Sequence, residues 1–93
     1  MDLKIKGRTA VVTGASQGLG RAIAIALALE GVKVAAVARR LNLLESLASE
    51  IVAAGGEKPA LIQADLYPED AADRIAESAL NSLGRVDILA NAA

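Results

Sequence analysis

The stretch Val11–Arg40, VVTGASQGLGRAIAIALALEGVKVAAVARR, decides the fold of this chain. A short β-branched run leads into three closely spaced glycines, an alanine-rich run follows, and a second apolar run ends at paired arginines. The two outer runs have the length and residue types of buried strands, whereas the alanine-rich run has the length of a helix. The order of strand, glycine-rich turn, helix and strand predicts a βαβ unit with parallel strands.

The remainder of the chain continues this alternation. Apolar runs that end at Val12 or span 32–38, 60–64 and 86–90 predict four strands. Helical patterns at 18–30, 41–54 and 68–83 lie between them. Short connections and strict alternation favour right-handed crossovers. We therefore predict an α/β fold: the first half of a Rossmann-type, doubly wound parallel sheet, with four strands in the order 3-2-1-4 and three helices, as a single half domain over residues 1–93.

Local signals mark the ends of the predicted helices. A glycine follows each helical pattern, at positions 31, 55 and 84. Pro68 suits the first position of the third helix, and the acidic residues Glu69 and Asp70 suit its first turn. The second helix carries a wide apolar stripe, which we interpret as core rather than as a partner surface because this helix must cover a sheet face. The stripe consists of Leu41, Leu43, Leu44, Leu47, Ala48, Ile51 and Val52.

Composition excludes several functional classes. The 93 residues have a formal net charge of −1, so no basic excess attracts nucleic acid. The chain has neither cysteine nor histidine, which excludes a thiolate nucleophile, an imidazole base and a zinc cluster, and we expect no metal site. The longest wholly apolar run, 22–29, is far shorter than the roughly 20 residues of a membrane span. We expect a cytoplasmic protein without membrane contact.

The glycine loop, defined as residues 14–20, is the first candidate site. One glycine follows a strand and two open a helix, so the backbone can approach a ligand without Cβ atoms in the way. Helix N-termini carry free N–H groups and partial positive charge, which fit the pyrophosphate of a dinucleotide. The alternative is an ordinary strand-to-helix turn in which the glycines only relieve steric crowding. The predicted ligands are Gly14, Ser16, Gln17, Gly18, Leu19 and Gly20.

The paired arginines are the second candidate. In a fold of this type the second strand ends near the adenosine ribose, where NAD-specific sites place a carboxylate. Here Ala38 stands at that position, and Arg39 and Arg40 follow it. A guanidinium binds a 2′-phosphate through parallel charge-assisted hydrogen bonds. We therefore predict NADP(H) as the cofactor, with Arg39 as the main residue that binds the 2′-phosphate and Arg40 as the second. The alternative is that both arginines are solvated charges at a strand end.

These motifs together resemble those of the short-chain dehydrogenase/reductase family. Residues 13–20, TGASQGLG, are similar to its Thr-Gly-x-x-x-Gly-x-Gly cofactor motif, and residues 6–12, KGRTAVV, are similar to its lead-in strand. Residues 87–93, DILANAA, resemble the segment that carries Asn-Asn-Ala-Gly, with Ala92 in place of the second asparagine. The resemblance covers the whole chain.

The resemblance implies further cofactor contacts. It assigns Asp65 and Leu66 to the adenine ring, and Asn91, Ala92 and Ala93 to the ribose side of the cofactor. Asp65 also suits a residue that caps a turn at a strand end. Asn91 also suits a residue that ties neighbouring strands together, and in the family the segment does both.

The family's activity is hydride transfer between NADP(H) and a carbonyl or secondary alcohol, and the resemblance favours reduction of 3-oxoacyl thioesters. The family keeps its catalytic Ser, Tyr and Lys beyond the segment that ends at Ala93. Tyr67 is not that tyrosine, because Ala71 rather than lysine follows it four residues later. We expect the N-terminal part of a longer, homo-oligomeric enzyme, with no catalytic residue and no activity in residues 1–93 alone. A non-catalytic dinucleotide-binding module and an assembly fragment remain alternatives.

Overall fold

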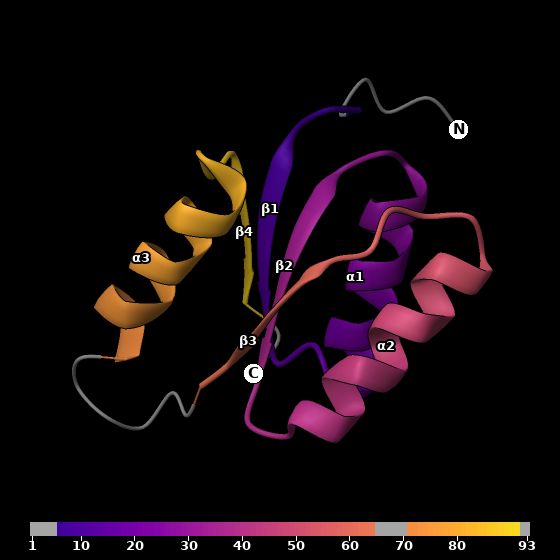
Figure 1. Ribbon diagram of the computed structural model, residues 1–93, viewed down its shortest axis with the longest axis horizontal. Helices are drawn as coiled ribbons and strands as arrows, with labels where there is room; N and C mark the ends of the chain where they lie inside the picture. The colour runs from indigo at the N-terminus through magenta and orange to yellow at the C-terminus, as the bar shows by residue number, and fades with distance from the viewer. Residues whose placement is uncertain (1–5, 65–70, 92–93) are drawn as a thin grey trace.

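The computed structural model describes residues 6–64 and 71–91, in which four strands alternate with three helices (Figure 1). The predicted types and order of these elements are confirmed, and some ends differ by a residue or two. None of the described helices is long and apolar enough to cross a membrane. The elements are β1 Thr9–Thr13, α1 Gly18–Leu29, β2 Lys33–Ala38, α2 Leu41–Ala53, β3 Ala60–Gln63, α3 Ala71–Leu83 and β4 Ile88–Asn91.

All strand pairs are parallel, and the sheet order β3-β2-β1-β4 confirms the predicted order. The register pairs Thr13 with Val37 of β2 and with Asn91 of β4, and Ala38 with Gln63 of β3. Because the strands run in the same direction, their carboxyl ends meet at one edge of the sheet. This carboxyl edge is where open α/β sheets bind ligands.

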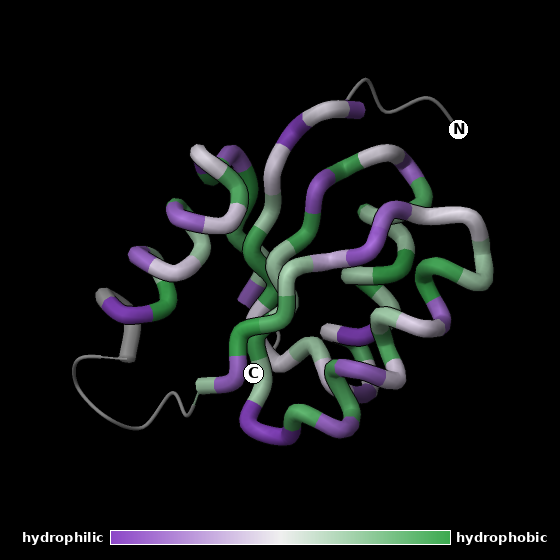
Figure 2. Tube along the Cα trace, viewed as in Figure 1, coloured by the Kyte–Doolittle hydropathy of each residue, from purple (hydrophilic) through white to green (hydrophobic). Residues whose placement is uncertain are grey.

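Helices cover the sheet from both sides: α1 and α2 lie on one face and α3 on the other (Figure 1). Helices α1 and α2 pack on Val12, Val34 and Ala36, whereas α3 packs on Val11 and Val37. Neighbouring residues of one strand therefore enter different cores, as the pleat of a strand requires. Hydrophobic colouring runs along the central strands, whereas the turn between β2 and α2 is hydrophilic (Figure 2).

The helix ends follow the glycine signals. Gly31, Gly55 and Gly84 come just after α1, α2 and α3, and each has a positive φ, between 82° and 95°. A side chain is strained there, so glycine ends each helix at low cost. The predicted start of the third helix at Pro68, with acidic residues at 69 and 70, lies outside the described residues.

The apolar stripe of α2 is narrower than predicted. Its buried side chains are Leu44, Leu47, Ala48 and Ile51. Leu41 and Val52, by contrast, are 40% and 52% exposed, so their assignment to the core was wrong. At 3.6 residues per turn these two residues lie together on one flank of the stripe, away from its buried centre.

The two inner strands match the prediction of strands covered on both faces, but the edge strands do not. The described side chains of β1 are buried throughout, and those of β2 from Val34 onward. Helix α3 packs on β2 and β3. In the described part of the chain no helix covers β4 on the face of the sheet where α3 lies, and Leu89 is 69% exposed.

Candidate functional site

The glycine loop joins β1 to α1 at the carboxyl edge of the sheet. Gly14 and Gly18 have φ values of 65° and 61°, a conformation that favours glycine. A Cβ added at Gly18 meets nothing within 4 Å, whereas a Cβ added at Gly20 collides with the carbonyl group of Gly14. The two helix-opening glycines therefore differ: Gly20 lets α1 pack against the loop, and Gly18 borders open space.

The N-terminus of α1 is open to an anion. Gln17 occupies the N-cap position, but its side chain makes no capping hydrogen bond, and the first turn holds no acidic residue. Leu19 is 70% exposed, so the described side chains do not cover this turn. The first N–H groups of a helix have no acceptor within the helix and carry partial positive charge. A phosphate group fits this position, and the open space beside Gly18 leaves room for one.

Backbone hydrogen bonds join the glycine loop to the end of β2, and the end of β2 to the end of β3. Ala15 N–H donates to the carbonyl oxygen of Val37 over 3.1 Å, so the loop folds against the end of β2. Ala64 N–H donates to the carbonyl oxygen of Ala38 over 3.0 Å, so the end of β3 lies beside the end of β2. Ala38 is 7% exposed, and its small side chain brings no charge to this edge.

The Arg39–Arg40 turn leads from this edge into α2. Both arginines are exposed. The side-chain amide Nε2 of Gln63 donates to the carbonyl oxygen of Arg39 over 3.1 Å. Leu43 and Leu44 donate their N–H groups to the carbonyl oxygen of Arg40, which starts the helix. Arg39 and Arg40, which we predict to bind the 2′-phosphate, therefore lie on the same edge of the sheet as the glycine loop.

Asn91 ends β4 beside the end of β1. The Thr13 hydroxyl donates to Oδ1 of Asn91 over 2.8 Å, and Thr13 is 7% exposed. This bond is the strand tie expected for Asn91. Contact of Asn91 with the ribose side of the cofactor stays a prediction. Four of the predicted cofactor residues, Asp65, Leu66, Ala92 and Ala93, lie outside the described residues.

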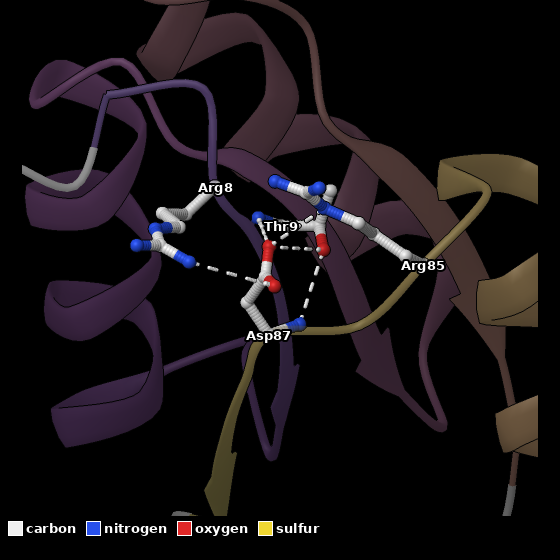
Figure 3. Close-up of polar contacts among 4 residues, drawn as sticks. All are labelled: Arg8, Thr9, Arg85 and Asp87. Atoms are coloured by element: carbon white, nitrogen blue, oxygen red, sulfur yellow. Dashed lines mark hydrogen bonds and ion pairs between the residues drawn. The ribbon is translucent and has the colours of Figure 1, made fainter.

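A polar cluster at the opposite, amino-terminal edge also joins β1 to β4 (Figure 3). Oδ2 of Asp87 accepts from Thr9 N–H over 3.0 Å, from the Thr9 hydroxyl over 3.2 Å and from Nε of Arg85 over 3.1 Å. Arg8 forms a longer ion pair of 3.9 Å with the same carboxylate. The backbone hydrogen bond from Thr9 leads the contacts that lower the pKa of Asp87. This cluster lies at the edge away from the glycine loop, and its contacts tie the start of β4 to β1.

Sequence reasoning missed two residues that contact the backbone of the candidate site. The Arg21 guanidinium donates to the carbonyl oxygen of Ser16 in the glycine loop. The Gln63 amide donates to the carbonyl oxygen of Arg39. A charged residue within the alanine-rich run was the available signal for Arg21, whereas nothing in the local sequence singled out Gln63.

Comparison with known proteins identifies the family. The family model described as short chain dehydrogenase matches residues 8–93. A short chain dehydrogenase of Pseudocercospora fijiensis is 44% identical over 90 residues, which are 97% of this chain and 29% of that protein. The 3-oxoacyl-[acyl-carrier-protein] reductase of a Synechocystis species is 38% identical over 88 residues, which are 94% of this chain and 35% of that protein.

A solved structure agrees with the sequence matches. The crystal structure of a metagenomic short-chain oxidoreductase in complex with NADP superposes with a TM-score of 0.83 and 44% identity, covering 90% of this chain and 38% of that one. The chain thus spans well under half the length of each of these proteins. The match to the family model, the half Rossmann sheet and the glycine loop at its carboxyl edge lead to one conclusion: the chain belongs to the short chain dehydrogenase family.

Proposed function

We propose that this chain is the cofactor-binding part of an NADP-dependent oxidoreductase. One observation carries the proposal: the uncapped N-terminus of α1 and the Arg39–Arg40 turn lie on the same edge of the sheet, and the uncharged Ala38 ends β2 directly before that turn. The first feature suits a pyrophosphate and the second a 2′-phosphate. The NADP complex of the metagenomic relative supports the same cofactor.

The proposal gives each predicted residue a role. The backbone of the glycine loop, with Ser16 and Gln17, binds the pyrophosphate, and Arg39 binds the 2′-phosphate with Arg40 beside it. Asp65 and Leu66 contact the adenine ring, and residues 91–93 contact the ribose side. When bound, NADP(H) supplies or accepts a hydride. The described residues hold and orient it by their N–H groups and positive charges.

For the complete protein we propose reversible hydride transfer to a carbonyl compound or from a secondary alcohol, with 3-oxoacyl thioesters as the substrate class. The named activity of the Synechocystis relative supports this class. Steady-state rates of the complete protein with 3-oxoacyl thioesters, simple ketones and NADPH test it, and a higher kcat/KM for the ketones contradicts it. A cytoplasmic location and homo-oligomeric assembly remain predictions.

The cofactor assignment is tested by the double variant Ala38→Asp with Arg39→Leu in the complete protein. The new carboxylate repels a 2′-phosphate and accepts hydrogen bonds from a 2′-hydroxyl, and the lost guanidinium removes charge-assisted bonds. We expect NADPH affinity to fall about tenfold to a hundredfold, with NADH affinity unchanged or higher.

Arg40→Leu is the matched control, and it should weaken NADPH binding less than the double variant does. Calorimetric titration measures all these affinities. A double variant that keeps the NADPH preference of the wild type refutes the assignment of the 2′-phosphate to Arg39.

A further inference from the structure

Arg21 joins the glycine loop to α2. It follows Gly20 in α1, and its side chain is 22% exposed. One terminal nitrogen, Nη1, donates to the carbonyl oxygens of Ser16 and Leu43 over 3.3 and 3.4 Å. The other, Nη2, donates to Oγ of Ser46 over 3.3 Å and to Oε1 of Glu50 over 2.9 Å. Three of these four acceptors belong to α2, and the fourth belongs to the glycine loop.

Only a guanidinium matches this set of acceptors. Its two terminal nitrogens carry N–H groups in a rigid planar fork, so each nitrogen can serve two acceptors. A lysine ammonium is a single point with three donors, so it cannot serve all four acceptors. Glu50 balances the charge of Arg21, so the residue acts on the loop through geometry more than through its field.

The contacts lie close to both predicted phosphate sites. Ser16 belongs to the loop proposed for the pyrophosphate. Leu43 belongs to the first turn of α2, directly after the Arg39–Arg40 turn proposed for the 2′-phosphate, and its N–H donates to the carbonyl oxygen of Arg40. One side chain therefore bridges the loop of the first predicted phosphate site and the helix turn beside the second.

We propose that Arg21 is a positioning residue that sets NADPH preference by holding these two sites at the right separation. This inference rests on the proposed function. NADPH engages both phosphate sites at once, so it benefits from their fixed separation, whereas NADH lacks the 2′-phosphate and does not engage the site at Arg39 and Arg40. Loss of the link should therefore weaken NADPH binding more than NADH binding.

The test is calorimetric titration of the complete protein with NADPH and with NADH. Arg21→Lys keeps the charge and removes the fork. We expect its NADPH dissociation constant to rise about tenfold and its NADH constant about twofold, so the preference falls about fivefold. A role confined to stability moves the melting temperature but leaves the ratio of the two constants unchanged. An unchanged NADPH constant, or constants raised by the same factor for both cofactors, overturns the inference.

A second variant keeps the test informative if Arg21→Lys does not fold. Glu50→Gln weakens one of the four bonds, and it should lower the NADPH preference about twofold. Glu45→Gln is the matched control, because Glu45 lies on the same helix and its side chain makes no hydrogen bond or ion pair with the described residues. Equal effects of the two glutamine variants overturn the inference.

The titrations separate this inference from the proposed function. A wild type that binds neither dinucleotide refutes the proposed function, and the inference with it. A wild type that binds NADPH in preference to NADH, combined with an unchanged ratio in the Arg21 and Glu50 variants, refutes the inference alone.

Discussion

Alanine substitutions at Gly18 and Gly20 separate two roles within one motif. A Cβ at Gly20 collides with the carbonyl group of Gly14, lies 2.7 Å from its carbon atom and 3.2 Å from Cα of Ala15. All three atoms are backbone atoms, so no flexible side chain can move aside. A Cβ at Gly18 meets no atom within 4 Å, and only its φ of 61° opposes the side chain.

The expected magnitudes follow from these contacts. Overpacking costs typically 1–3 kcal/mol, and we expect Gly20→Ala to cost about 3 kcal/mol because α1 must move away from the loop. A left-handed residue with a Cβ costs about 1 kcal/mol, which we expect for Gly18→Ala. Against a total stability of roughly 5–15 kcal/mol, the first loss is large and the second is small.

Urea denaturation of the complete protein, followed by circular dichroism, measures both losses as changes in the free energy of unfolding. The packing account predicts that Gly20→Ala is the less stable variant by about 2 kcal/mol. It also predicts that Gly18→Ala loses cofactor affinity while it stays folded. Equal stability of the two variants, or a greater loss in Gly18→Ala, refutes the distinction.

Three further predictions concern the core, the amino-terminal edge and activity. Leu44→Ala should cost about 2–5 kcal/mol of unfolding free energy, whereas Leu41→Ala should stay within about 0.5 kcal/mol; equal costs contradict the α2 packing. The lowered pKa of Asp87 stabilises the fold above the ordinary carboxyl pKa of about 3.9. This stabilisation is lost as the pH falls through the pKa of Asp87 in the folded protein. The free energies of unfolding of wild type and Asp87→Asn, measured from pH 7 to pH 2, should therefore converge at low pH. A difference that stays constant over this range refutes the assignment. Residues 1–93 alone should not oxidise NADPH with ketones or acyl thioesters, and sustained oxidation above blank contradicts that expectation.

The sequence was sufficient for the elements and their order, because each signal was local. Uniformly apolar runs marked the inner strands, and a glycine just past each helical run marked its end. The difference between Gly18 and Gly20 was not visible in the sequence, since it depends on how closely α1 approaches the backbone of Gly14.

Contacts between distant residues also escaped the sequence analysis. Arg21 meets Glu50 only because α1 and α2 pack side by side, and Thr9 meets Asp87 only because β4 pairs with β1. Amphipathic spacing indicated the centre of the α2 stripe but not its width, because the spacing does not show which flanking side chains the rest of the fold buries. Such partners are set by topology, so a pattern along the chain does not name them.

We propose that the glycine loop binds the pyrophosphate of NADPH while Arg39 binds the 2′-phosphate. A crystal structure of the complete protein with NADPH bound measures both positions directly. We expect pyrophosphate oxygens within hydrogen-bond distance of the N–H groups at the start of α1, beside Gly18, and the 2′-phosphate against the guanidinium of Arg39. A pyrophosphate away from the glycine loop, or a 2′-phosphate that contacts neither Arg39 nor Arg40, contradicts it.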